Sequence, residues 1–166
     1  MKLYTKALFT KFILITLLLL LPSYICSADV QTENTDNGKK VTMIEVGELV
    51  HPFDAVAAFK KNDENCIGFT IKAPEYLYVD GNYIEAEIDN NIDIIYKMKI
   101  FATTHRPLMG EYVTNCAVYF NEEMRVKFLN ANHITFRIPY QNYPNITYTM
   151  LPIVLDNFKK VLSRDA

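Results

Sequence analysis

The sequence predicts a mainly β protein, an antiparallel Ig-like β-sandwich with a short helix near the start of the domain and a second helix at the C-terminus. Residues 71–88 alternate apolar and polar side chains and break once at Asp80-Gly81, which is the pattern of two strands joined by a turn. Turn-forming stretches recur between short apolar segments along the rest of the chain. Tyrosine is abundant, at 11 of 166 residues, and favours strands.

Taken in order, the domain starts with a predicted strand over 41–50. A short helix is predicted over 52–61, because Pro52 and Asp54 suit a helix start and Lys60 and Lys61 suit a helix end. Strands are then predicted over 67–72, 76–79, 83–88, 94–102, 111–120, 125–129, 133–138 and 146–150. The last helix follows in "PIVLDNFKKVL", where Val154, Phe158, Val161 and Leu162 lie on one face.

The N-terminal residues 1–28 have the pattern of a secretory signal peptide. A lysine-containing start precedes the apolar run "FILITLLLLL", and Pro22 and a small-residue cleavage site after Ala28 follow it. The alternatives are an uncleaved membrane anchor, for which the apolar run is short, and a lipoprotein modified at Cys26, for which Ile25 is an unsuitable neighbour. We therefore expect a secreted or periplasmic protein with no membrane span after cleavage. A flexible polar leader is expected at 29–40, and a single β-rich domain at 41–166.

The charge of the mature chain argues against two classes of partner. Cleavage removes three lysines and no acidic residue, so 14 basic side chains remain against 19 acidic ones, a formal charge near −5. An acidic chain without a basic cluster disfavours nucleic acid and anionic membranes as partners.

Two cysteines remain in the mature chain, Cys66 and Cys116. Paired cysteines are common in exported domains, so a disulfide between them is expected, and the alternative is two free thiols. Neither local sequence surrounds the sulfur with cations that would activate it.

No catalytic, cofactor-binding or metal-binding residue is expected. His51, His105 and His133 have no metal-ligand spacing with one another or with cysteine. Ser163 is the only serine after the signal peptide, and no nucleophile motif or glycine-rich phosphate loop occurs.

Tyrosine supplies the candidate partner-binding residues. The segment "PYQNYPNITY" (139–148) has little charge and several rings, and Tyr140, Tyr143 and Tyr148 are the expected contacts with another protein. The alternative is that these rings pack in the core.

Residues 71–109 resemble the Ig-like domain of the SoxY-like sulfur-oxidation carrier family. Ala73-Pro74, Asp80-Gly81 and Pro107-Leu108 follow the family's order of turns. The resemblance implies a periplasmic β-sandwich that carries sulfur intermediates on a cysteine in a C-terminal Gly-Gly-Cys-Gly tail. This chain ends "KKVLSRDA" and lacks that tail, so the resemblance implies the sandwich without the carrier cysteine.

The function expected from the sequence is that of an exported, non-catalytic protein-binding or accessory module whose partner is another protein. The alternatives are a periplasmic small-ligand carrier of the SoxY-like type and an exported hydrolase.

Overall fold

The computed structural model describes residues 30–35 and 38–164, so the predicted signal peptide at 1–28 lies outside the described residues. The described chain forms nine strands, two α-helices and one short 3-10 helix. In order these are β1 (Gln31–Thr35), β2 (Gly38–Val46), η1 (Gly47–Val50), β3 (Ala55–Lys61), β4 (Glu64–Ala73), β5 (Tyr83–Ile88), β6 (Ile95–Leu108), β7 (Glu111–Phe120), α2 (Glu122–Asn130), β8 (Ile134–Ile138), β9 (Ile146–Thr149) and α3 (Pro152–Ser163). The prediction of a mainly β, antiparallel protein is confirmed.

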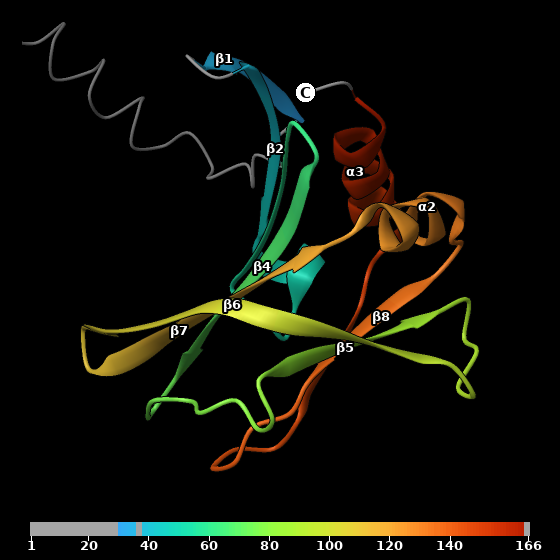
Figure 1. Ribbon diagram of the computed structural model, residues 1–166. Helices are drawn as coiled ribbons and strands as arrows, with labels where there is room; N and C mark the ends of the chain where they lie inside the picture. Colours follow the sequence, from blue (N-terminus) through green and yellow to red (C-terminus); the bar gives the residue numbers. More distant parts are fainter. Residues whose placement is uncertain (1–29, 36–37, 165–166) are drawn as a thin grey trace, which may run out of the picture.

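The nine described strands form one sheet in the order β1-β2-β3-β4-β7-β6-β5-β8-β9 (Figure 1). The long strand β6 joins its two halves, because residues 95–99 pair with β5 and residues 100–108 pair with β7. The register shifts between Ile100 and Ala102, which makes Phe101 the extra residue of a β-bulge. A bulge bends its strand and increases the local twist, so the first part of β6 can turn away from β7.

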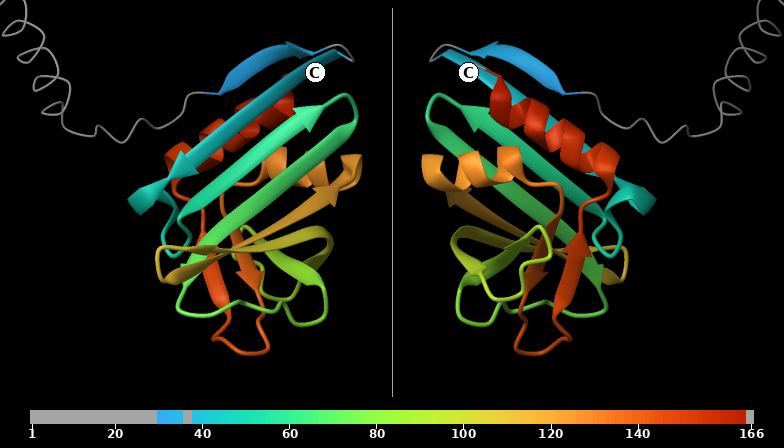
Figure 2. Two further views of the ribbon diagram at one scale, coloured as in Figure 1. Left: turned by 90° about the vertical axis from the view of Figure 1, so that its left-hand side faces the viewer. Right: turned by 90° about the vertical axis from the view of Figure 1, so that its right-hand side faces the viewer.

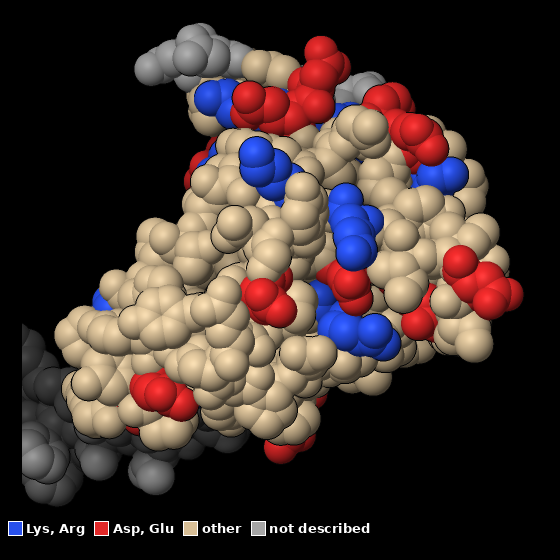
Figure 3. All heavy atoms as spheres, turned by 60° about the horizontal axis from the view of Figure 1, so that its bottom comes forward, with Lys and Arg blue, Asp and Glu red and all other residues tan. Residues whose placement is uncertain are grey.

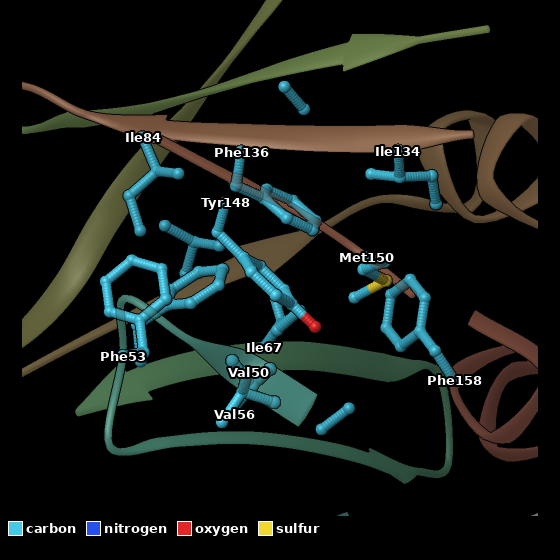
Figure 4. Close-up of a cluster of buried hydrophobic side chains, with 14 of the residues drawn as sticks. Val50, Phe53, Val56, Ile67, Ile84, Ile134, Phe136, Tyr148, Met150 and Phe158 are labelled. Carbon is cyan, nitrogen blue, oxygen red and sulfur yellow. The ribbon is translucent and has the colours of Figure 1, made fainter. Parts of the chain in front are cut away.

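Side chains from the two halves meet in one core (Figure 4). The ring centroids of Phe69 on β4 and Phe136 on β8 lie 5.1 Å apart. Phe53, just before β3, lies 5.8 Å from Tyr148 on β9 in an edge-on arrangement. Tilted and edge-on ring pairs at these distances stabilise a core beyond the area they bury.

The two helices lie on the same side of β2, β3 and β4 (Figure 2). The C-terminal helix α3 covers the segment for which the sequence predicts a helix, and its predicted apolar face is buried. Phe158 of α3 packs against Phe128 of α2 at 5.5 Å. Arg125 of α2 also donates a hydrogen bond from Nη1 to the carbonyl of Leu162 at 2.8 Å, which fixes α2 against the end of α3.

Three predicted elements are wrong. The segment 52–61 contains strand β3 in place of a helix, and 125–129 belongs to helix α2 in place of a strand. The segment 76–79 is part of the loop between β4 and β5 and makes only an isolated bridge, between Val79 and Tyr140. In the first case β3 pairs with β2 and with β4, and these two ladders outweigh the helix preference of its alanines and lysines. In the second case Asn121 accepts a hydrogen bond from the backbone N–H of Met124 at 3.0 Å, a helix N-cap that the sequence reading overlooked.

The predicted disulfide is also wrong, because Cys66 and Cys116 are free thiols. They lie on the neighbouring strands β4 and β7, where Cys66 pairs with Tyr119 and Cys116 pairs with Phe69. The two cysteines are therefore three positions apart in register. Side chains an odd number of positions apart point to opposite faces of a sheet, so the two sulfurs are on different sides.

The segment expected to be a flexible leader contains strand β1, which pairs antiparallel with β2. Among the described residues, no helix has the length and apolar character needed to cross a membrane.

Candidate functional site

The face of β2, β3 and β4 that points away from the helices is uncovered. The left view of Figure 2 shows these strands with no helix in front of them. Alternate residues of the strands point to this face. They include Ile44 and Val46 of β2, both exposed, and a row of small residues, Ala57, Gly68 and Ala117, in register on β3, β4 and β7. The same alternation places Lys40, Lys61, Glu64 and Lys72 near the ends of these strands, so the uncharged part of the outer face is its centre.

Aromatic rings form one row across this outer face. Phe59 of β3 pairs with Cys66 of β4, which pairs with Tyr119 of β7. The rings of Phe59 and Tyr119 lie edge-on at 6.2 Å, one on each side of Cys66. This explains why Cys66 is buried although it points outward. Phe101, the bulge residue of β6, stacks on Tyr119 with centroids 3.9 Å apart and planes 18° apart.

The stacked rings remain accessible to solvent. Phe101 is 48% exposed and Tyr119 is 43% exposed. Two large rings held against each other in water have lost part of their conformational freedom without being buried. A partner that covers the two rings would bury their apolar area at a small cost in side-chain entropy. For this reason rigid aromatic residues contribute much of the binding free energy at protein interfaces.

A groove of 490 Å³ begins beside this ring pair. It lies where β6 and β7 diverge, β7 continuing toward α2 and β6 toward β5 (Figure 1). Its walls are the five consecutive residues 95–99 of β6 on one side and the end of β7 and the start of α2 on the other. The lining from the second wall comprises Tyr119, Phe120, Asn121, Glu123, Met124 and Lys127.

One wall of the groove is an open strand edge. The backbone N–H of Ile100 donates to the carbonyl of Asn82 at 3.0 Å, so Ile100 directs its amide toward the β5 side. Strand residues direct their backbone groups to alternate edges. Met98 and Tyr96 therefore bond to β5, whereas Ile95 and Lys97 direct their N–H and C=O groups into the groove. Within the described chain, residues 95–99 pair with β5 alone.

The groove carries an excess of positive charge. Lys97 and Lys99 stand on the β6 wall and Lys127 on the α2 wall, while Glu123 is the one acidic residue of the lining. Glu123 lies 3.4 Å from Lys127, whose ammonium also lies over the ring of Tyr96 at 5.4 Å. Lys97 contacts Glu85 only at 3.9 Å, and no ion pair within the described residues involves Lys99.

A second group of rings surrounds His105. Its Nε2 lies 2.9 Å from the carbonyl of Leu77, to which it donates a hydrogen bond. Tyr76 lies edge-on to the imidazole at 5.4 Å and packs on Tyr112 at 4.2 Å, and Tyr78 lies at 5.8 Å. These contacts fix the loop between β4 and β5 to the β6–β7 hairpin. We assign this group a structural role, because the imidazole proton is committed to a backbone carbonyl.

The other two histidines, His51 and His133, are exposed. In the described part of the chain, no group of three or more His, Cys, Asp or Glu side chains has the geometry to hold a metal ion. On the face drawn in Figure 3, basic and acidic side chains lie in small mixed groups, and charged side chains are sparse on the left, where the β6–β7 hairpin lies in Figure 1.

The three tyrosines proposed from the sequence as partner contacts do not share one surface. Tyr140 is 6% exposed and Tyr148 is 2% exposed, so both rings are buried in the core. Tyr143 is at the surface. Period-two alternation places Tyr148 on the same side of β9 as Ile146, which is the side that faces the core.

The two buried thiols are weak nucleophiles at neutral pH. Burial raises the pKa of Cys66 to about 12, with a smaller contribution from the negative charge of Glu64. Burial also raises the pKa of Cys116 to about 12. A thiol with such a pKa is protonated at neutral pH, and the thiolate is the nucleophilic form.

Neither the pairing of Phe101 with Tyr119 nor the groove was predicted from the sequence. The bulge could have been predicted from the apolar–polar alternation before His105, because this alternation shifts by one residue at Phe101. The divergence of β6 from β7 has no local signal, because it depends on which strands pair.

Comparison with known proteins adds no relative, since no family model, no curated protein and no solved structure matches this chain.

Proposed function

We propose that this protein is an exported, non-catalytic binding module that contacts another protein through the outer face of its sheet. The observation that carries the proposal is the stacked pair Phe101 and Tyr119, which is held in a fixed geometry while nearly half exposed. Export is supported by the signal-peptide pattern of residues 1–28.

The composition of the surface supports a protein as the partner. Aromatic residues are enriched and charged residues depleted at the centres of protein interfaces. Here Phe59, Tyr119 and Phe101 form a continuous row, and the neighbouring row of Ala57, Gly68 and Ala117 leaves space for the side chains of a partner.

The Ig-like sandwich remains part of this proposal. Its support is that β4 and β8, which belong to different halves of the sheet, face each other through Phe69 and Phe136. The alternative of a SoxY-like carrier has less support, because a carrier cysteine must be reachable and both thiols are buried with raised pKa values.

Site-specific photo-crosslinking in the native host tests the proposal. Phe101 is replaced by a benzophenone-bearing phenylalanine, and Met109, which is fully exposed in the β6–β7 turn, is replaced in the same way as the matched control. We expect one covalent adduct of defined mass at position 101 and none at position 109. The absence of an adduct at position 101, or the same adducts at both positions, would overturn the proposal.

A further inference from the structure

We infer that the groove between β6 and α2 binds an extended acidic segment of the partner, which adds to the sheet as a strand beside residues 95–99. The inference rests on the proposed function and specifies the chemistry of the partner. Its starting point is that no described strand pairs with Ile95 or Lys97 on the edge that faces the groove, whereas the opposite edge of β6 is paired with β5.

The backbone geometry selects a strand as the occupant. Unpaired N–H and C=O groups along a strand edge form a template for another strand, and an extended peptide can satisfy them with main-chain hydrogen bonds. Five residues of β6 extend over about 17 Å, at about 3.4 Å per residue, which is long enough for a short strand addition. The strand would occupy the position that β7 leaves when it turns toward α2.

The side chains of β6 then specify the sequence pattern of the occupant. Lys97 and Lys99 point to the outer face. Tyr96 and Met98, which alternate with them along β6, point to the inner face, because their partners Ala86 and Ile84 are buried in the core. Cross-strand neighbours on one face of a sheet interact directly, and opposite charges there are favourable. The occupant should therefore present acidic residues to the outer face.

The inner side of the groove favours apolar residues in the occupant. Met124 and Phe120, both buried, line the groove from α2 and β7 on the side of Met98. A segment that alternates acidic and apolar residues satisfies both sides at once. The same alternation with lysine in place of the acidic residues would set like charges against Lys97 and Lys99.

A synthetic peptide provides the test. The probe is a fluorescein-labelled seven-residue peptide of alternating valine and glutamate, and its matched control has lysine in place of glutamate. Two further versions carry N-methyl groups on the glutamate amides alone or on the valine amides alone. Since each set of amides points to a different edge of a strand, methylation of one set removes the hydrogen bonds to β6 and methylation of the other does not.

Fluorescence polarisation with the purified protein gives the readout. We expect the glutamate peptide to bind at least about tenfold more tightly than the lysine peptide, on the basis of two or three cross-strand charge pairs. We also expect one of the two N-methylated peptides to bind and the other not. The double variant K97E/K99E should lose affinity for the glutamate peptide, whereas K39E, a change in β2 away from the groove, should not.

Three results would overturn the inference. These are equal binding of the glutamate and lysine peptides, equal binding of the two N-methylated peptides, and no binding of any peptide. A dimer in sedimentation that excludes the peptide would assign the groove to a second copy of this chain and overturn it as well. A crosslink at position 101 together with a failed peptide test would leave the proposed function standing and remove only this inference.

Discussion

Asn157 of α3 donates a hydrogen bond from Nδ2 to Oε1 of Glu45 on β2 at 2.7 Å, in the part of the core that the helix covers. Glu45 is fully buried and Asn157 nearly so. Lys160 donates to Oδ1 of the same asparagine at 3.1 Å, so the amide group is held at both ends. This polar contact fixes the rotation of α3 against the sheet in a way that apolar packing alone does not.

The first prediction concerns this contact. Asn157→Ala removes a donor from a buried carboxyl group and should lower the free energy of unfolding by about 1–3 kcal/mol. Denaturant unfolding measures the change. The control is Asp156→Ala, an exposed neighbour in the same helix, which should change the stability by less than about 0.5 kcal/mol. Equal effects of the two substitutions would show that the contact does not stabilise the fold.

The second prediction separates the ring of Tyr140 from its hydroxyl group. The hydroxyl is buried beside the thiol of Cys116, which is its one polar neighbour among the described residues. Burial raises the pKa of the hydroxyl, with smaller contributions from the charge of Cys116 and from a hydrogen bond with that thiol. Because a thiol is a weak hydrogen-bond partner, Tyr140→Phe should leave the stability unchanged or slightly increased. Tyr140→Ala should cost about 3–5 kcal/mol, since it removes a buried ring. A large loss in the phenylalanine variant would mean that this hydrogen bond stabilises the fold.

The third prediction concerns the thiols. In the native protein at pH 8 neither Cys66 nor Cys116 should react with a thiol reagent, and both should react after unfolding, because burial keeps them protonated. The intact mass should not change on reduction. Rapid labelling of the folded protein, or a gain of two hydrogens on reduction, would contradict the free, buried thiols.

The same thiols predict a pH dependence of stability. Their pKa is raised in the folded state from the ordinary value of 9.0 to about 12, so the unfolded chain loses these protons first as pH rises. Stability should fall between about pH 9 and 12, by about 1.4 kcal/mol per pH unit for each thiol. The variant Cys116→Ala should show a shallower decline in the same window, and an unchanged slope would mean that the Cys116 thiol does not contribute.

The fourth prediction separates binding from folding. The double variant F101A/Y119A removes a stacked pair whose rings are about half exposed, so its stability should fall by about 1–3 kcal/mol, from the ring contact and the apolar area the two rings bury. Its binding to the partner should be lost. Phe69→Ala, in the core, should instead cost about 3–5 kcal/mol. If F101A/Y119A unfolded as readily as the core variant, the pair would be part of the core and not a contact surface.

Much of the β character of the chain could be predicted from local pattern. The alternation around Tyr83 and Ile84 identified β5, and the apolar spacing of Val154 and Phe158 identified α3. Segment 52–61 could not be assigned correctly, because its alanines and lysines favour a helix and only the ladders with β2 and β4 make it a strand.

Less of the candidate site than of the fold could be predicted from the sequence. Tyrosine count drew attention to 139–148, but the exposure of a ring depends on which face of its strand meets the core, and Tyr148 meets it. The surface formed by Phe59, Tyr119 and Phe101 combines three strands that are distant in sequence. Its assembly requires the strand order and the bulge at Phe101, neither of which a local pattern encodes.

Both proposed contacts require a partner that covers the ring pair and the open edge of β6. Residue-resolved amide hydrogen exchange measures this directly, in the free protein and in the complex captured through position 101. We predict that the amides of Ile95 and Lys97 exchange rapidly in the free protein and slowly in the complex, while those of Tyr96 and Met98 are protected in both. Slow exchange of Ile95 and Lys97 in the free protein, or no added protection in the complex, would contradict the proposed contact with β6.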